Sequence, residues 1–216
     1  MRSAASILIL PMVLAAGAPL RAQSPHYGFS LNLSIPTGAF ASTTYPAYMD
    51  SLNNLVPPQK ETYDLGLGGS FTASFPVDRF LAVRLNLGGT SESGTNRAQG
   101  YPSINLQHSI FNLGGDLQFF PQGAAFRHRG FYFVGGLSAD FERFDRSYGD
   151  PQYDFTDTTQ KSRLGGSVGF GHSFGYDAGW RFTMEATFHK TLTGHDVNAG
   201  DPPSTDFVKV GFGFVF

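Results

Sequence analysis

Apolar and polar residues alternate along eight segments of the chain, each long enough to cross a bilayer as a tilted strand. In the last segment, Val208, Val210 and Phe212 alternate with Lys209 and Gly211. Successive side chains of a strand point to opposite faces, so each segment predicts a strand with one apolar and one polar face. The predicted strands are His26–Ile35, Tyr63–Phe75, Phe80–Gly89, Gln107–Phe119, Phe131–Arg143, Ser162–Phe174, Trp180–Leu192 and Asp206–Phe216.

Short and long connections alternate between these segments. The short ones are Pro76–Arg79, Pro121–Gly130 and Gly175–Gly179, and the long ones are Thr37–Thr62, Thr90–Leu106, Phe144–Lys161 and Thr193–Thr205. A soluble sandwich also has alternating strands, but it has no reason to alternate its loop lengths, whereas membrane barrels have short periplasmic turns and longer extracellular loops. We therefore predict an all-β fold, an antiparallel up-and-down transmembrane β-barrel of about eight strands with four longer extracellular loops.

The N-terminal residues have the pattern of a removable export signal. Arg2 carries a positive charge, residues 7–14 are apolar apart from Pro11, and small residues follow. The alternative is a retained anchor, but Pro11 and the small residues favour cleavage between Ala18 and Ala22. The predicted domains are a signal peptide at 1–22 and a β-barrel domain at 23–216.

Composition removes several classes of function. The chain has no cysteine, which excludes disulfides, cysteine-based zinc sites and thiol catalysis. Its net charge of −2 gives no reason to expect a nucleic-acid partner. After residue 22 no run of 18 apolar residues occurs, so no transmembrane helix is expected. Abundant Gly and Phe, at 27 and 22 residues, also favour strands over long helices.

The polar faces of the predicted strands carry four basic and four acidic side chains. These residues are Arg84, Asp116, Asp140, Glu142, Arg163, Arg181, Glu185 and Lys209. The interior of an eight-stranded barrel is just wide enough for side chains to fill, and unpaired buried charges are costly. We therefore expect these residues to form an interior charge network. The alternative is that they line a narrow channel or a small-molecule-binding lumen.

Aromatic residues cluster near the predicted strand ends, where membrane proteins place interface girdles. The main candidates are Tyr27, Phe119, Phe131, Phe133 and Trp180, with Phe120 and Phe216 as further members. In a soluble protein the same residues would form a core. The export signal favours the girdle.

The final strand resembles the C-terminal assembly signal of outer-membrane barrels, which ends in an aromatic residue preceded by apolar residues at alternate positions. The matching residues are Val208, Val210, Phe212, Phe214 and Phe216. The segment from Gly28 to Gly38 is also similar to first strands of small barrels of this kind. The mature chain thus resembles the eight-stranded barrels of the outer-membrane protein A and X type. This resemblance implies a location in the bacterial outer membrane and recognition by the barrel-assembly machinery.

A hydrolase is the main enzymatic alternative, because outer-membrane lipid A deacylases are eight-stranded barrels with a serine, a histidine and a glutamate. His172, Ser173 and Glu185 are the candidates here. In that family the histidine stands two residues before the serine, so both share a face, whereas His172 and Ser173 are adjacent and should point to opposite faces. We therefore expect no enzyme activity and no catalytic residue.

The sequence as a whole predicts an integral outer-membrane barrel with a structural or surface-interaction role. Its expected partners are outer-membrane lipid, the assembly machinery and an extracellular ligand bound through the loops, which carry specificity in most folds. We expect a monomer, with no cofactor, no bound metal and no nucleic-acid partner.

Overall fold

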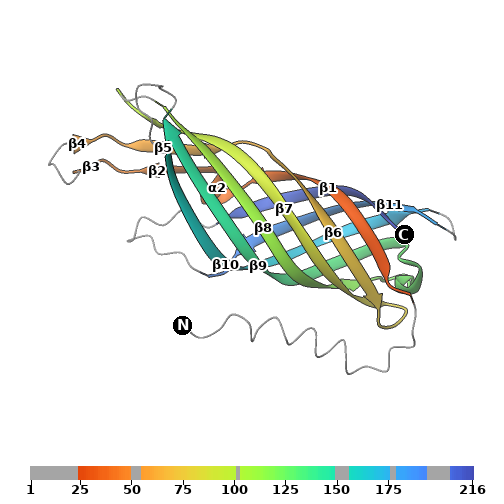
Figure 1. The fold of residues 1–216 in the computed structure, drawn as a ribbon. Helices are drawn as coiled ribbons and strands as arrows, with labels where there is room; N and C mark the ends of the chain where they lie inside the picture. Colours follow the sequence, from red (N-terminus) through yellow and green to blue (C-terminus); the bar gives the residue numbers. More distant parts are fainter. Residues whose placement is uncertain (1–23, 50–54, 101–102, 149–155, 176–178, 194–204) are drawn as a thin grey trace.

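Antiparallel strands form almost all of the computed structural model, which describes residues 24–49, 55–100, 103–148, 156–175, 179–193 and 205–216. Eight strands make a closed ring in the order β7-β6-β1-β12-β11-β10-β9-β8, and the pairing of β7 with β8 closes it (Figure 1). Their bounds are β1 (His26–Pro36), β6 (Gly66–Pro76), β7 (Leu81–Ala98), β8 (Ile104–Phe119), β9 (Gly130–Tyr148), β10 (Thr156–Phe174), β11 (Arg181–Thr191) and β12 (Asp206–Val215). The predicted antiparallel eight-stranded barrel is confirmed.

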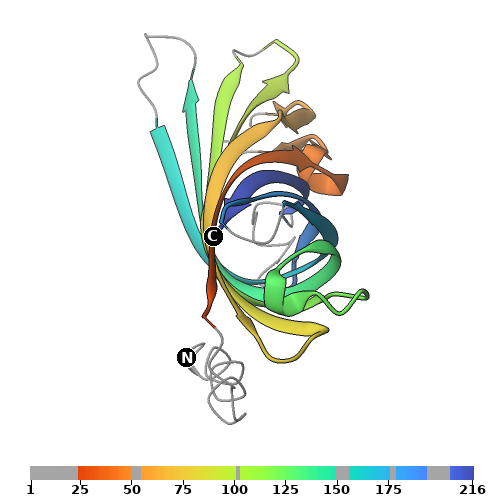
Figure 2. The ribbon, with the colours of Figure 1, turned by 90° about the vertical axis from the view of Figure 1, so that its right-hand side faces the viewer.

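The barrel turns its apolar side chains outwards and its polar side chains inwards, and Figure 2 shows the strands surrounding this interior. Highly exposed apolar residues occur on neighbouring strands, including Leu67, Phe71, Leu87, Leu117, Phe141, Val168 and Phe170. Many inward-facing residues of the same strands are buried although they are polar or charged, including Asn112, Asp116, Gln118, Asp140 and Glu142. A water-soluble barrel would invert this arrangement, because exposed apolar surface is unfavourable in water but not in lipid.

Two predicted loops are wrong in extent, because the barrel wall continues through them. Thr90–Leu106 is mostly strand: β7 runs on to Ala98, β8 begins at Ile104, and the two stay in register. Likewise β9 reaches Tyr148 and β10 begins at Thr156, inside the predicted loop Phe144–Lys161. Beyond the apolar belt of the wall the outward side chains become polar, as in Ser91 and Arg143, so the hydrophobic alternation ends before the hydrogen-bonded pairing does.

The first long connection has structure of its own. It contains helix α2 (Gly38–Ala41) and strands β2 (Ser42–Tyr45), β3 (Tyr48–Met49), β4 (Leu55–Val56) and β5 (Gln59–Tyr63). The β2–β5 pair extends the sheet beside β7 and projects from one end of the barrel (Figure 1). The predicted strand Tyr63–Phe75 is therefore divided: its first residue belongs to β5, and β6 begins at Gly66 after a break at Asp64.

The opposite end of the barrel has compact turns. In the turn between β6 and β7, the Asp78 carboxylate accepts hydrogen bonds from the backbone N–H groups of Phe80 and Leu81, at 2.6 and 2.8 Å. The turn between β8 and β9 contains a short 3₁₀ helix, η1 (Ala125–Arg127). Phe120, expected in the aromatic girdle, is instead fully buried in this turn, because β8 ends one residue earlier and the chain bends inwards there.

No helix in the described part of the chain is long and apolar enough to cross a membrane. The predicted signal peptide at 1–22 lies outside the described residues.

Candidate functional site: the barrel interior

A salt-bridge cluster centred on Arg84 crosses the middle of the barrel. Arg84 on β7 donates to Asp116 on the neighbouring β8, with Nε and Nη2 at 3.0 and 2.9 Å from Oδ2. It also donates from Nη2 to Oε1 of Glu185, at 3.0 Å. Glu185 lies on β11, four strands away in a ring of eight, so this contact spans the lumen. Tyr132 completes the cluster by donating to Glu185 Oε2 at 2.9 Å.

A polar cavity of about 60 Å³ lies beside this cluster. Lys209 lines the cavity and lies near the carboxylates of Asp116, Asp140 and Glu185. No hydrogen bond or ion pair joins Lys209 to any residue that the structure describes. The nearby carboxylates offset part of the cost of burying this amine, and the cavity beside it has space for water.

A hydrogen-bonded pair of His189 and Asp140 lies towards the loop end of the lumen. His189 Nε2 on β11 is 2.9 Å from Asp140 Oδ2 on β9, and the Ser138 hydroxyl donates to the other oxygen of Asp140 at 2.7 Å. The imidazole also stacks on Phe207, with ring centroids 4.7 Å apart. Gly165 leaves the space for this pair, because a Cβ there would collide with the Asp140 carboxylate and the His189 ring.

Arg163 and Glu142, two further predicted charges, form a buried pair on the loop side of His189. Arg163 on β10 and Glu142 on β9 approach to 3.3 Å, and both side chains are almost completely buried. The remaining predicted charge, Arg181, is also buried, on β11 at the turn end of the lumen. The structure thus brings Arg84, Asp116 and Glu185 together, with Lys209 beside them. It places Glu142 and Arg163 in a separate pair and Asp140 with His189.

An aromatic plug closes the loop end of the lumen. Phe40, carried inwards by α2, stacks on Tyr63 at 4.7 Å between ring centroids and meets His108 edge-on at 5.0 Å. Phe144 stacks on the other side of His108 at 4.4 Å. His108 Nδ1 lies 2.9 Å from Glu92 Oε2, and neither side chain is exposed. The strand pattern of the sequence did not predict this plug, because Phe40 and Glu92 fall in predicted loops.

The signal for Glu92 was nevertheless present in the sequence. Thr90, Glu92, Gly94 and Asn96 continue the inward alternation of β7, and all four are buried in the structure. Above them, Glu61 accepts hydrogen bonds from Asn96 and Arg146, at 3.1 and 3.2 Å. These contacts hold the extended strands of the loop end to one another.

A second plug closes the turn end. Phe120, Tyr132, Ala82 and Ala125 form a buried apolar cluster, and the ring of His128 packs edge-on against Phe120 at 5.4 Å. His128 adopts a left-handed backbone conformation at the end of η1, with φ of 44°. Burial, with a smaller contribution from the charge of neighbouring His26, lowers the pKa of the His128 imidazole to about 3. His128 is therefore neutral at pH 7.

The structure does not bring the hydrolase candidates His172, Ser173 and Glu185 together. Ser173 points into the barrel and is buried, whereas His172 lies on the outer side, with its ring 4.2 Å from that of Phe174. The two therefore lie on opposite faces, and Glu185 is bound to Arg84. Among the described residues no group of three or more His, Cys, Asp or Glu side chains could hold a metal ion.

The outer surface holds the predicted interface aromatics and the C-terminal pattern. Tyr27, Phe119, Phe133 and Trp180 are strongly exposed, and Phe131 is half-buried. Phe212, Phe214 and Phe216 are exposed too, while Val208 and Val210 are half-buried. Trp180 packs on Phe216 with ring centroids 4.9 Å apart, next to the backbone pairing of Tyr27 with Phe216 that joins the two chain ends of the barrel.

Comparison with known proteins identifies the fold. No family model and no curated protein matches the chain. The outer membrane protein OprG of Pseudomonas aeruginosa matches with a TM-score of 0.56 and 15% identity, covering 89% of this chain and 95% of OprG. Ail of Yersinia pestis, the attachment invasion locus protein, matches with a TM-score of 0.51 and 12% identity, covering 88% and 98%. Ail in complex with the heparin analogue sucrose octasulfate gives a TM-score of 0.52 at 10% identity, covering 89% and 99%. The chain therefore has the fold of the small eight-stranded β-barrels of the bacterial outer membrane.

Proposed function

We propose that this chain is an integral outer-membrane barrel that interacts with extracellular partners through its loops, with no catalytic role and no cofactor. The observation that carries the proposal is the combination of an apolar outer wall with a lumen filled by ion pairs and closed by an aromatic plug at each end. Because the lumen is filled, the loop end is the surface that remains for binding a partner. Outer-membrane lipid would cover the apolar wall.

Two sequence patterns support a route to the membrane. Residues 1–22 would direct export and be removed, leaving 23–216 as the barrel. The alternating apolar residues that end at Phe216 would be recognised by the barrel-assembly machinery. Because the lumen is filled within one chain and the ring has no open edge, we propose a monomer.

The extended strands supply the surface for interaction. Beyond the apolar wall, the outward positions become polar, as in Ser91, Ser109 and Arg143. Contacts within this surface hold it in one shape: the Thr158 hydroxyl donates to Asp145 at 2.6 Å, and Arg143 Nε donates to the same carboxylate at 2.8 Å. Ail, which shares this fold, forms a complex with a heparin analogue, and this supports an extracellular ligand for the present chain.

A narrow channel is the alternative, and the geometry favours it less. Arg84 and Glu185 bridge the lumen, and Phe40 and Phe120 are fully buried in the plugs at its two ends. The described cavity between the plugs is about 60 Å³, enough for a few water molecules rather than for a continuous path.

Two measurements test the proposal. Refolded protein in planar bilayers should give no steady conductance, and stepwise currents in the wild-type chain would favour the channel instead. Cells displaying the protein should adhere to a heparin-coated surface more strongly than cells displaying a variant with residues 96–104 replaced by an Asn-Gly turn. This turn joins the paired Thr95 and Asn105 and keeps the pairing of β7 with β8 below them, while it removes Asn96, Arg97 and Ala98, with which β5 pairs. Equal adhesion of the two would count against a binding role for this hairpin.

A further inference from the structure

The two turns that precede β7 and β9 form a single surface at the closed end of the barrel. Phe120 N donates to Phe80 O at 2.7 Å, and Ala125 N donates to Arg79 O at 3.0 Å. Gly123, which has a φ of +68°, lies against the same residues: a Cβ there would be 3.3 Å from Phe80 and 3.7 Å from the Arg79 side chain. The backbones of the two turns are therefore held in fixed positions relative to one another.

Three arginines lie on this surface. Arg79 belongs to the first turn, and Arg127 and Arg129 follow Ala125 in the second. Arg79 and Arg127 are exposed and Arg129 is half-exposed. The acidic side chain of the same turns, Asp78, is occupied by the backbone N–H groups of its own turn. This concentration of positive charge stands out in a chain with a net charge of −2.

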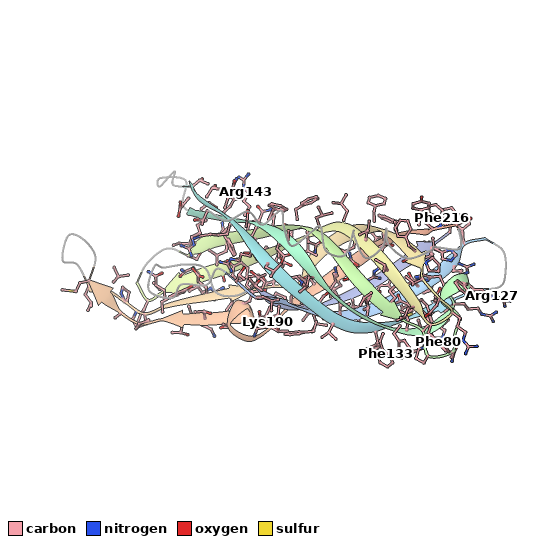
Figure 3. The ribbon with its side chains drawn as sticks, turned by 90° about the horizontal axis from the view of Figure 1, so that it is seen from below. Phe80, Arg127, Phe133, Arg143, Lys190 and Phe216 are labelled. Carbon is pink, nitrogen blue, oxygen red and sulfur yellow. The ribbon has the colours of Figure 1, made fainter. Side chains whose placement is uncertain are left out.

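Exposed apolar side chains lie in the same two turns and at the adjoining strand ends. Val77, Leu81, Phe119 and Phe126 are exposed, and the Arg79 guanidinium lies over the Phe80 ring, 4.5 Å from its centroid. Figure 3 shows Arg127 at the turn end of the barrel, with Phe80 on the same end and Arg143 and Lys190 towards the loop end. Cations above an apolar belt lie at the depth of lipid headgroups.

We propose that Arg79, Arg127 and Arg129 form a binding site for the phosphate headgroup of an anionic phospholipid in the periplasmic leaflet. The proposal rests on the proposed insertion in the outer membrane, which places the short turns on the periplasmic side. Guanidinium groups bind phosphate oxygens through paired, charge-assisted hydrogen bonds, and basic clusters at a membrane surface attract anionic lipids. The neighbouring apolar residues would contact the acyl chains, which a soluble phosphate lacks.

The test measures the dissociation constant of phosphatidylglycerol for the refolded full chain in detergent micelles, by native mass spectrometry. The variant Arg79→Gln/Arg127→Gln/Arg129→Gln should bind phosphatidylglycerol at least about tenfold more weakly at low salt. Phosphatidylcholine with the same acyl chains should bind wild type and variant equally. Glycerol phosphate should not compete, since it has no acyl chains to fill the apolar part of the site.

A matched variant controls for the loss of three positive charges. Lys60→Gln/Arg97→Gln/Arg143→Gln removes three exposed cations at the loop end and should leave phosphatidylglycerol binding unchanged. Unchanged binding in the turn variant, or an equal loss in both variants, would overturn the proposal. Heat-modifiable gel mobility of all three proteins reports insertion of the folded barrel separately. If the protein folds as a barrel but binds the two lipids equally, the proposed lipid site is wrong and the proposed membrane location still stands.

Discussion

Arg84 and Glu185 join opposite walls of the barrel: Arg84 Nη2 on β7 lies 3.0 Å from Glu185 Oε1 on β11, four strands away around the ring. Asp116 holds the same guanidinium from the neighbouring strand, and Tyr132 holds the Glu185 carboxylate. The pair therefore links two opposite strands across a lumen whose width is set by the number and tilt of the strands, and it holds the groups around it in place.

Removing Arg84 should destabilise the barrel strongly. In Arg84→Met, two buried carboxylates lose their counter-charge, and breaking a buried pair in this way costs about 3–5 kcal/mol. Glu185→Gln should cost about 1–3 kcal/mol, because the amide oxygen can still accept from Arg84 and Tyr132, whereas its NH2 group cannot accept from the guanidinium. Urea unfolding in detergent micelles measures both free energies. Arg143→Gln breaks the exposed contact with Asp145 and should change stability by less than about 1 kcal/mol. A larger effect at Arg143 than at Arg84 would contradict the role given to the interior pair.

Phe40 should contribute more to stability than its place in a long connection suggests. Phe40→Ala removes a fully buried ring from between Tyr63 and His108 and should cost about 3–5 kcal/mol. Phe126→Ala is the matched comparison, because that ring is 38% exposed at the other end of the barrel. The same unfolding experiment compares the two. Similar losses at both positions would show that the α2 plug is not packed as described.

A methyl group at Gly165 should disrupt the pair of His189 and Asp140. In Gly165→Ala the new Cβ would occupy the space of the Asp140 carboxylate, so we expect a destabilisation of about 1–3 kcal/mol from overpacking. Gly135→Ala is the control on the neighbouring strand, since its Cβ would meet nothing nearer than a backbone oxygen 3.8 Å away. The measurement compares the free energies of unfolding of the two variants. Equal values would mean that His189 and Asp140 can shift to accommodate the new methyl group.

Acid should destabilise the barrel partly through His128. Its folded pKa of about 3 lies below the ordinary histidine value of 6.5, so the unfolded chain binds the extra proton between these pH values. Stability is therefore fully present above about pH 6.5 and falls as the pH drops towards 3, by up to about 1.4 kcal/mol per pH unit. His128→Asn, in which asparagine tolerates the left-handed conformation, should show a shallower decrease when unfolding is measured from pH 7 to pH 4. The same slope in both proteins would exclude this contribution.

The proposed orientation can be tested by labelling, because the chain contains no cysteine. A membrane-impermeant maleimide should label Thr156→Cys, at the start of β10, on intact cells. It should label Gln122→Cys, in the turn after β8, only after lysis. Both positions are exposed in the structure, so a difference between them reports the side of the membrane. Labelling of Gln122→Cys on intact cells would show that the turn after β8 lies on the outside of the cell, contrary to the proposed orientation.

The sequence by itself determined the strands, the faces of each strand and the antiparallel barrel, because a period of two separates lipid-facing from lumen-facing residues wherever the outer wall touches lipid. It also predicted a set of charges on the polar faces of the strands, from Arg84 to Lys209. It misjudged the extent of β7 to β10, since hydrophobic alternation disappears where strands leave the bilayer although Thr90 to Asn96 remain paired with β8.

Only the tertiary structure decided which charges meet. Arg84 could have been paired with Asp116 from their places on neighbouring strands, but its contact with Glu185 depends on barrel closure, which brings residues 101 positions apart face to face. The same holds for Phe40, whose inward turn is set by contacts of α2 with other elements rather than by a local pattern. The gathering of Arg79, Arg127 and Arg129 likewise depends on hydrogen bonds between two turns. Local periodicity specifies a strand, whereas contacts across the lumen and between turns depend on closure of the whole ring.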